Sequence, residues 1–236
     1  IVKPDMTKWG KASIHLCLDE SELAESILNA RKSSSSGYVE IESYIEGIDV
    51  SCLCFCDKGH VTDIAWWDEL VGIDRNGKIL GAGISIPSVI EGTIAQQEAA
   101  TIGKRLMEGF HDVCALILLS FRITNSGKPY LIEIHADLGG DYIAEALLPA
   151  AMPDFNFFKL AIDVALGKGI SSVSKPTLVY YGSSDDADNP PYSIVQKDTV
   201  QDNLLFIEER YNNRFMFQPL HFKWLSNYYG GLKDEI

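Results

Sequence analysis

The stretch from Tyr130 to Asp141 (Tyr-Leu-Ile-Glu-Ile-His-Ala-Asp-Leu-Gly-Gly-Asp) holds the residue types best suited to metal and phosphate chemistry. Glu133 stands near the end of an apolar run, where an unpaired carboxylate is costly unless it binds a cation or a hydrogen-bond donor. His135 follows two residues later and shares the same side of a strand. An apolar strand that ends in an acid and enters a paired-glycine loop directs a carboxylate toward a metal-bound phosphate.

A hairpin signal, Asn125-Ser-Gly-Lys128, precedes this stretch and predicts that Ser120 and Arg122 lie across the hairpin from Glu133. Magnesium bound to ATP usually takes about two carboxylates together with phosphate oxygens, and this hairpin offers one acid. A single histidine near a strand end is more often a hydrogen-bonded neighbour than a ligand, so both interpretations of His135 stay open.

Two segments nearer the N-terminus could serve a nucleotide. Lys3 ends a strand-like segment before Pro4, where it could reach a phosphate as a point charge or remain an ordinary surface lysine. In the segment Glu40 to Gly47, Glu42 can accept from the amine of a planar base, and the backbone from Ser43 to Ile45 can face its ring. Asp49 suits a ribose hydroxyl. A solvated acidic strand edge is the alternative interpretation of this second segment.

The composition of the 236-residue chain is that of a globular protein with one large domain or two small ones. A net charge of −13 argues against a general nucleic-acid or membrane surface, and no apolar run approaches the length of a bilayer span. We therefore expect a cytoplasmic protein without nucleic-acid or membrane partners. Because the chain opens inside a strand-like segment, we also expect that further residues precede it.

Three of the five cysteines, Cys52, Cys54 and Cys56, alternate along one expected strand and so share a face. They are too close along one strand to bridge each other and lack the paired CxxC spacing of a zinc site. Small buried thiols in a reducing compartment are the expected role.

The elements that must position these residues indicate an α+β protein with mainly antiparallel strands. Asp19 or Ser21 is expected to cap the first helix, which would carry Leu23, Ile27 and Leu28 on one face. Asp154 is expected to cap the third helix, which would direct Phe158, Ile162 and Ala165 toward the core. Strands are expected over residues 1–4, 12–18, 38–43, 49–56, 60–67 and 115–124, and a further strand begins at residue 130. Helices are expected over 22–32 and 94–109, and a third helix ends at residue 167. Hairpin turns are expected at 57–59 and 74–77.

Taken in order, four segments resemble the ATP-grasp superfamily: Val2–Pro4, Ile41–Asp49, Ser120–Ile123 and Tyr130–His135. The resemblance spans residues 1 to about 168 and is greatest to carboxylate–amine ligases, including amino-acid ligase-like members. It implies an ATP-grasp fold with two α+β subdomains and ATP between them. The small subdomain would span 1–68, the large one with the metal and phosphate site 69–168, and a C-terminal extension 169–236.

The resemblance also implies a ligase that uses ATP and Mg²⁺. The γ-phosphate would pass to a small-molecule carboxylate, and an amine would attack the acyl phosphate. Carried over to this chain, the resemblance implies that the metal ligands are Glu133 and His135 and that the catalytic residue is Arg122. The loop that contacts the substrate would contain Gly139, Gly140 and Asp141. The residues that bind the nucleotide cofactor would be Lys3, Glu42, Ser43, Ile45, Asp49 and Leu131.

This sequence departs from the family at three positions. Ser120 stands where the family usually has Asp or Glu, His135 where it has Asn, and Asp137 where it often has Arg. Together they remove a metal carboxylate and a phosphate-facing cation that would stabilise charge. The alternative function is therefore a degenerate ATP-grasp domain that binds a nucleotide or a partner without turnover. A homodimeric assembly is left open.

Overall fold

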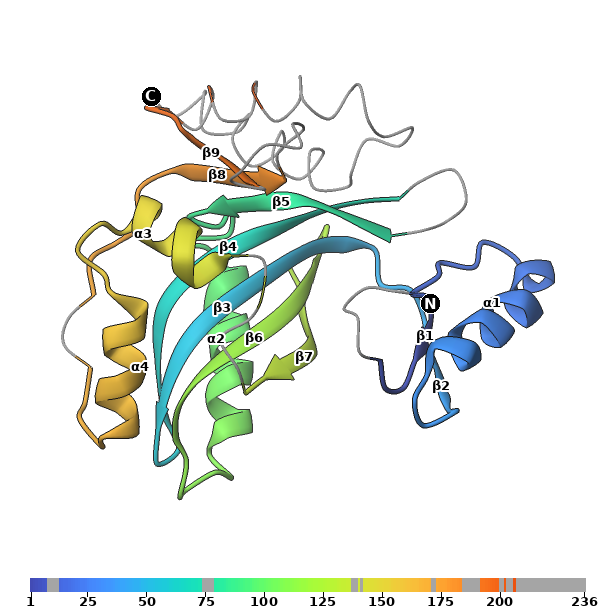
Figure 1. The fold of residues 1–236 in the computed structure, drawn as a ribbon, viewed down its shortest axis with the longest axis horizontal. Helices are drawn as coiled ribbons and strands as arrows, with labels where there is room; N and C mark the ends of the chain where they lie inside the picture. Colours follow the sequence, from blue (N-terminus) through green and yellow to red (C-terminus); the bar gives the residue numbers. More distant parts are fainter. Residues whose placement is uncertain are drawn as a thin grey trace.

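One seven-stranded antiparallel sheet, in the order β7-β6-β3-β4-β5-β8-β9, dominates the computed structural model (Figure 1). Its strands are β3 (Gly47–Asp57), β4 (His60–Ile73), β5 (Ile79–Ile86), β6 (Cys114–Thr124), β7 (Pro129–His135), β8 (Val179–Ser183) and β9 (Tyr192–Gln196). The expected α+β class with antiparallel strands is confirmed. The structure describes residues 1–7, 13–73, 79–136, 140, 142–170, 173–183, 192–199, 202 and 206.

Two hairpins of this sheet form where local turn chemistry predicts them. Strands β3 and β4 are joined by Lys58 and Gly59, with φ of 51° and 85°. A two-residue loop with positive φ at both positions matches the twist of the strands that it joins. Strands β6 and β7 are joined by residues 125–128 as predicted. The turn expected at 74–77 lies outside the described residues.

A small N-terminal unit lies beside the sheet (Figure 1). It consists of helix α1 (Glu20–Ser33) packed on a two-stranded sheet of β1 (Val2–Pro4) and β2 (Val39–Ile41). Asp19 caps α1, since its carboxylate accepts from the Ser21 backbone N–H at 2.7 Å. The strand expected over 12–18 is wrong for its described residues, which make one isolated bridge between His15 and Val2.

The buried face of α1 is also narrower than expected. Ser26 and Ala30 are its buried residues, whereas Leu28 is 57% exposed. The partner sheet has only two strands of three residues each, so it cannot cover the whole apolar stripe of a four-turn helix. Residue spacing alone therefore overestimated the contact.

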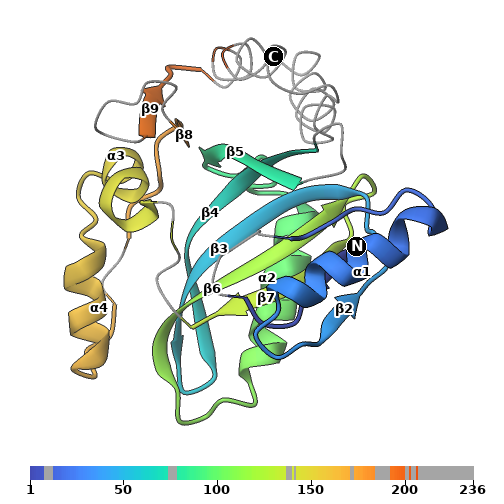
Figure 2. The ribbon, with the colours of Figure 1, turned by 45° about the vertical axis from the view of Figure 1, so that its right-hand side comes forward.

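Alternating residues of β3 point into two separate cores. Cys52 and its alternating neighbours pack with helix α2 (Ile94–Met107) on one face, which we call the α2 face. Leu53 and Phe55 pack on the other face, against the π-helix η1 (Ile143–Leu147), α3 (Leu148–Ala151) and α4 (Phe157–Ala165). Figure 2 shows α2 behind the sheet and α4 on another side of it. No helix in the described ranges is long and apolar enough to cross a bilayer.

Helix α4 corrects two expectations. Its N-cap is Asn156, which accepts from the Lys159 backbone N–H at 2.8 Å, rather than Asp154. The expected core residues Phe158, Ile162 and Ala165 are exposed, and the helix instead buries Phe157 and Val164. Adjacent faces of this helix are both apolar, so periodicity could not tell which of them meets the sheet.

The expected division of the chain stays a prediction, and the strands can be compared with its two boundaries. A boundary at residue 68 would cut through β4, and β8 and β9 of the segment 169–236 extend the same sheet as β3 to β7. The structure therefore separates residues 1–41, which form the N-terminal unit, from the strands that begin at Gly47. Residues 42–46, which we call the connector, join the two parts.

Candidate functional site

A row of four polar side chains crosses the sheet opposite the α2 face. Ser51 of β3 donates a hydrogen bond to Glu69 Oε1 of β4 at 2.6 Å, and its Oγ lies 3.0 Å from the Oγ of Ser120 on β6. Ser120 pairs in register with Glu133 of β7. Because directly opposed residues of antiparallel strands share a face, Glu69, Ser51, Ser120 and Glu133 form one line, which we call the polar row.

At one end of the polar row, the two residues predicted to bind a metal contact each other. His135 Nε2 lies 3.0 Å from Glu133 Oε1, and their side chains are 34% and 59% exposed. An N–H at Nε2 can donate to the carboxylate whether the imidazole is neutral or charged. The structure thus brings Glu133 and His135 together, and any cation at Glu133 must replace or share this contact.

Beside the polar row, Arg122 holds the connector against the sheet. Arg122 Nη2 donates to Asp49 Oδ2 at 3.1 Å, and Nη1 donates to the Ile45 backbone carbonyl at 3.3 Å. Its Nε lies 2.6 Å from Asp49 Oδ1 as an ion-pair contact outside hydrogen-bond geometry. The Arg122 guanidinium also lies 5.7 Å from the centre of the Tyr44 ring. Three of the predicted site residues therefore form one unit, with the arginine as the support.

Lys3 and Glu42, both predicted to contact the nucleotide, are also paired. Lys3 Nζ lies 3.0 Å from Glu42 Oε1 and 3.1 Å from Glu40 Oε2. Burial alone would lower the pKa of Lys3, but the hydrogen bonds with Glu42 and Glu40 outweigh burial and raise it above its ordinary value. The lysine is therefore a cation held at the edge of the N-terminal unit, next to the connector that contains the exposed Ser43.

The remaining predicted residues are not all brought to this place. Leu131 packs against the core of the α2 face beside Phe121, because a β-bulge follows Ser120 in the β6–β7 pairing. Gly140 is exposed, and its carbonyl accepts from the Ile143 N–H at 3.3 Å. Gly139 and Asp141 lie outside the described residues, as does Asp137.

Sequence reasoning missed Ser51 and Glu69. Ser51 interrupts an otherwise apolar strand and shares a side with Asp49, while Glu69 interrupts the apolar run of β4. A polar residue within a buried strand is the signal that could have found each of them. Their contact depends on the strand register, which places Glu69 opposite Asp49 and Ser51 opposite Ser120.

A second missed carboxyl group, Asp68, is buried on the opposite side of β4. It accepts from the Ser88 hydroxyl at 2.5 Å and from the Val89 N–H at 2.9 Å. Burial raises the pKa of Asp68 to about 8, against the lowering effect of these hydrogen bonds. Asp68 supports the chain that leaves β5 and does not belong to the polar row.

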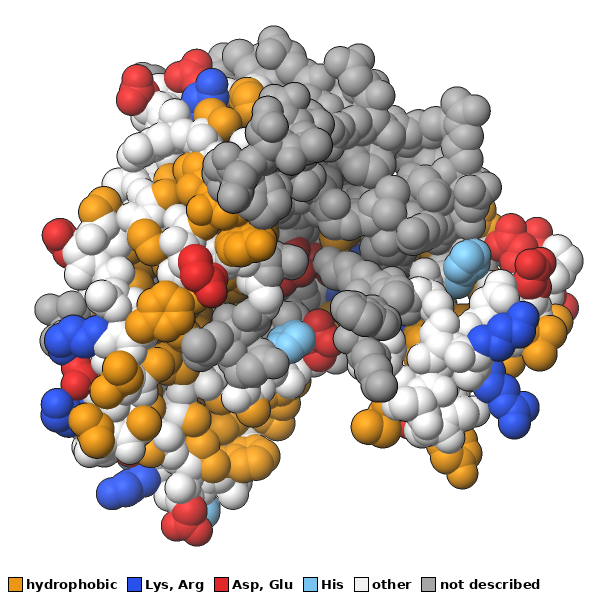
Figure 3. Space-filling model, in the orientation of Figure 1, with side chains coloured by type: hydrophobic (Ala, Val, Ile, Leu, Met, Phe, Trp, Pro, Cys, Tyr) orange, Lys and Arg blue, Asp and Glu red, His pale blue; other side chains and the backbone are white. Residues whose placement is uncertain are grey.

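Together, the polar row, the Asp49–Arg122 pair and Lys3 surround the junction between the N-terminal unit and the sheet. Figure 3 shows a hollow between these two parts, with acidic and histidine side chains at its inner end. Carboxylate and hydroxyl oxygens are the ligands that Mg²⁺ prefers, and Mg²⁺ often keeps only one or two protein carboxylates. Glu133 with Ser120 therefore fits one side of a magnesium–phosphate site.

No family model matches the sequence, and no curated protein matches it. Solved structures do match the fold. N5-carboxyaminoimidazole synthetase from Staphylococcus aureus, complexed with ADP, has a TM-score of 0.65 at 12% identity over 89% of this chain and 60% of its own. Biotin carboxylase from Campylobacter jejuni, in a β,γ-ATP complex, has a TM-score of 0.60 at 14% identity, and the match covers 77% of this chain and 41% of that structure. L-amino acid ligase from Bacillus licheniformis has a TM-score of 0.59 at 18% identity, and the match covers 77% of this chain and 43% of that structure.

These structures are ATP-grasp proteins, so the predicted ATP-grasp fold is confirmed. At such low identities the similarity establishes the fold alone. The chain spans between 41% and 60% of the length of these three structures.

Proposed function

From the ATP-grasp fold we propose that this chain is the nucleotide-binding part of a ligase that uses ATP and Mg²⁺ to join a small-molecule carboxylate to an amine. The observation that carries the proposal is the position of Lys3, Glu42, the Asp49–Arg122 pair and Glu133 around the junction of the two parts. Two of the structures with this fold contain ADP or a form of ATP, and they are 12% and 14% identical in sequence to this chain.

The pairing of Lys3 with Glu42 couples two expected nucleotide contacts. A phosphate that attracts the Lys3 ammonium withdraws it from Glu42, which lies 3.0 Å away. The released Glu42 carboxylate can then accept from the exocyclic amine of adenine, while the backbone from Ser43 to Ile45 faces the ring. One ligand therefore satisfies both members of the ion pair, and ligands that lack either the base or the phosphates satisfy only one.

Arg122 acts in this proposal as a positioning residue. Its guanidinium fork is engaged by Asp49 and by the Ile45 carbonyl, so it sets the connector at the place where the base would bind. Asp49 would accept from a ribose hydroxyl, since a carboxylate can accept several hydrogen bonds. Leu131, whose side chain packs on the α2 face, would contribute to the nucleotide site through its strand.

The proposed reaction has two steps and needs only ATP, the carboxylate and the amine. A carboxylate oxygen of the substrate attacks the γ-phosphorus, ADP leaves, and an acyl phosphate forms. The amine nitrogen then attacks the carbonyl carbon, the carbon–oxygen bond to phosphate breaks, and the amine loses a proton. Mg²⁺, when bound, would neutralise phosphate charge, and Glu133 and His135 would be the residues near it. We propose that Gly139, Gly140 and Asp141 contact the substrate carboxylate.

Two features favour the second candidate, a degenerate domain that binds nucleotide without turnover. Ser120 is a hydroxyl where the family has an acid, and the remaining Glu133 is paired with His135. Both features weaken the positive charge that the chain could gather at the transferred phosphate. A cytoplasmic location, the lack of nucleic-acid partners and a homodimeric assembly stay predictions.

The two candidates separate in two measurements on the full-length protein. Thermal denaturation with ATP, with and without Mg²⁺, measures binding, and phosphate release with pools of carboxylates and amines measures turnover. Release that needs both a carboxylate and an amine supports the ligase. Binding without release from any pool supports the degenerate domain, and the lack of any Mg·ATP stabilisation rejects both.

Glu133→Gln provides the matched test of the metal side. It should remove the Mg²⁺-dependent part of the stabilisation by ATP, because the amide keeps the shape of the side chain and loses its charge. Glu25→Gln, on the exposed surface of α1, is the control and should leave the Mg²⁺-dependent stabilisation unchanged. Equal loss in both variants would contradict the placement of the metal at Glu133.

A further inference from the structure

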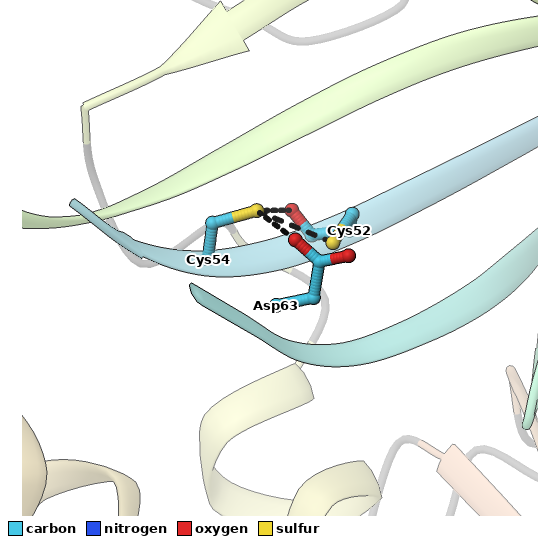
Figure 4. A group of neighbouring side chains, drawn as sticks. All are labelled: Cys52, Cys54 and Asp63. Carbon is cyan, nitrogen blue, oxygen red and sulfur yellow. Dashed lines mark hydrogen bonds between the residues drawn. The ribbon is translucent and has the colours of Figure 1, made fainter. Parts of the chain in front are cut away.

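Three side chains with metal-binding atoms converge on the α2 face, away from the polar row. Cys52 and Cys54 come from β3, and Asp63 comes from the neighbouring β4 (Figure 4). The two Sγ atoms lie 3.2 Å apart, and Cys54 Sγ lies 3.9 Å from Asp63 Oδ1. All three ligand atoms lie within 4.8 Å of one another. A β-bulge between Leu53 and Cys54 in the β3–β4 pairing brings Asp63 beside the second thiol.

We propose that Cys52, Cys54 and Asp63 bind a thiophilic divalent cation, with Zn²⁺ as the natural candidate. Zinc takes thiolate and carboxylate ligands at about 2.0–2.3 Å, which places neighbouring ligand atoms of a tetrahedral site roughly 3.3–3.8 Å apart. The observed separations of 3.2 and 3.9 Å need to change by only a few tenths of an ångström. Three protein ligands leave a fourth position for water or another donor.

The carboxylate of Asp63 is already oriented for this role. Trp66 Nε1–H donates to Asp63 Oδ2 at 3.2 Å, which leaves Oδ1 directed toward the thiols. A fixed outer hydrogen bond of this kind orients metal ligands and tunes their affinity. The pair of Asp63 and Trp66 distinguishes the site from an accidental contact between two small buried side chains.

A groove gives the cation a route to these ligands. Its volume is about 830 Å³, and it is bounded by β4, by helix α2 and by the segment around Lys175. Asp63, Trp66 and Glu91 line it together with Lys104 and Lys175, whereas Cys52 and Cys54 are 0% and 1% exposed and do not line it. A cation that enters the groove would therefore reach Asp63 before the thiols beside it.

Burial also affects the ionisation of the Cys52 thiol. Burial raises the pKa of the Cys52 thiol well above its usual value, and the hydrogen bond with Cys54 raises it further. A divalent cation bound by two thiolates and one carboxylate leaves a net charge of −1, and its binding to the thiols releases their protons.

Cobalt and zinc titrations of the reduced, metal-free full-length protein test this inference. Co²⁺ should produce a thiolate-to-metal absorption band that saturates at one equivalent, and one equivalent of Zn²⁺ should abolish the band. Cys52→Ser and Cys54→Ser should each lose the band. Asp63→Asn should weaken binding at an unaltered thiol pair, and Trp66→Phe should weaken it by about 10–100-fold.

Cys56→Ser is the matched control. Cys56 lies on the same face of the same strand and is 0% exposed, but its thiol is not among the three clustered ligands. It should keep full cation binding. The proposal is wrong if Cys56→Ser loses as much binding as Cys54→Ser, or if the protein shows no thiolate band. Asp63→Asn keeps both thiols, so unchanged binding in that variant also overturns the proposal even where a serine variant fails to fold.

Discussion

At the scale of single residues, the contact between Arg122 and Asp49 is the best-defined part of the candidate site. Arg122→Lys keeps the positive charge and loses the planar fork that reaches Asp49 and Ile45 together. Hydrogen bonds to charged groups contribute about 1.5–3 kcal/mol each, so we expect the Kd for Mg·ATP to rise by about 10–100-fold. Calorimetric titration measures the change.

Arg105→Lys is the matched control for this prediction, because Arg105 is exposed on α2. Its affinity for Mg·ATP should equal that of the unaltered protein. Unchanged affinity in Arg122→Lys would show that the connector does not need this support to bind the nucleotide.

Ser120 permits a prediction of gained function. Ser120→Asp places a second carboxylate opposite Glu133 across the β6–β7 pair. Without metal, the two like charges should lower the melting temperature. With Mg²⁺ and ATP, the added oxygen ligand should increase the Mg²⁺-dependent stabilisation.

Thermal denaturation with and without Mg²⁺ measures both effects. Ser120→Asn has the same size without the charge and should show neither. Identical behaviour of the aspartate and asparagine variants would argue against a metal between these strands.

Asp68 predicts how stability depends on pH. Its pKa rises from 3.8 to about 8 on folding, so the folded state binds the proton more tightly than the unfolded state. Stability from this group is complete below pH 3.8 and falls as pH rises through the interval up to about 8.

The difference in unfolding free energy between the unaltered protein and Asp68→Asn isolates this effect, since all other titrating groups are shared. That difference should decrease from pH 4 to pH 8 and become constant above it. A constant difference over the whole interval would show that Asp68 stays ionised in the fold.

At the scale of elements, β3 matters most, because it carries Asp49, Ser51 and the clustered thiols and pairs with both β4 and β6. Gly47 starts this strand, and a Cβ there would lie 2.2 Å from the Ile123 carbonyl oxygen of β6. Gly47→Ala must therefore displace one backbone from the other. We expect a loss of about 1–3 kcal/mol in unfolding free energy, measured by urea denaturation.

Gly169→Ala is the control for the β3 prediction, because a Cβ at that glycine meets nothing within 4 Å. Its stability should change little. Equal stability of Gly47→Ala and the unaltered protein would mean that the start of β3 can move away from β6 at little cost, contrary to the close approach in the structure.

At the scale of the whole molecule, the N-terminal unit and the sheet are joined by the exposed connector, 42–46. A nucleotide bound at their junction contacts both parts and restrains the backbone between them. We expect amide exchange in the connector to slow when Mg²⁺ and a non-hydrolysable ATP analogue are added, because a ligand that contacts the connector stabilises its hydrogen-bonded conformation. Helix α4 contacts the opposite end of β6, near Cys114, and its amide exchange is the internal control. Equal change at both places would contradict a site at the junction.

The sequence by itself determined the features that depend on neighbouring residues. The Lys58–Gly59 hairpin, the Asp19 cap and the turn at 125–128 form where turn and capping chemistry predict them, because the interacting groups are only a few residues apart. The order of four short motifs also indicated the ATP-grasp fold. These local signals were sufficient for the class of the protein and for most of its strands.

Only the tertiary structure decided which side chains meet. The β-bulges near Cys54 and Ser120 change which residues face each other, so Asp63 reaches the thiols and Leu131 turns to the α2 face. Register likewise joins Ser51 to Glu69, and packing selects which apolar face of α4 is buried. These contacts link residues far apart in the chain, and their geometry depends on all the strands between them, which no local pattern contains.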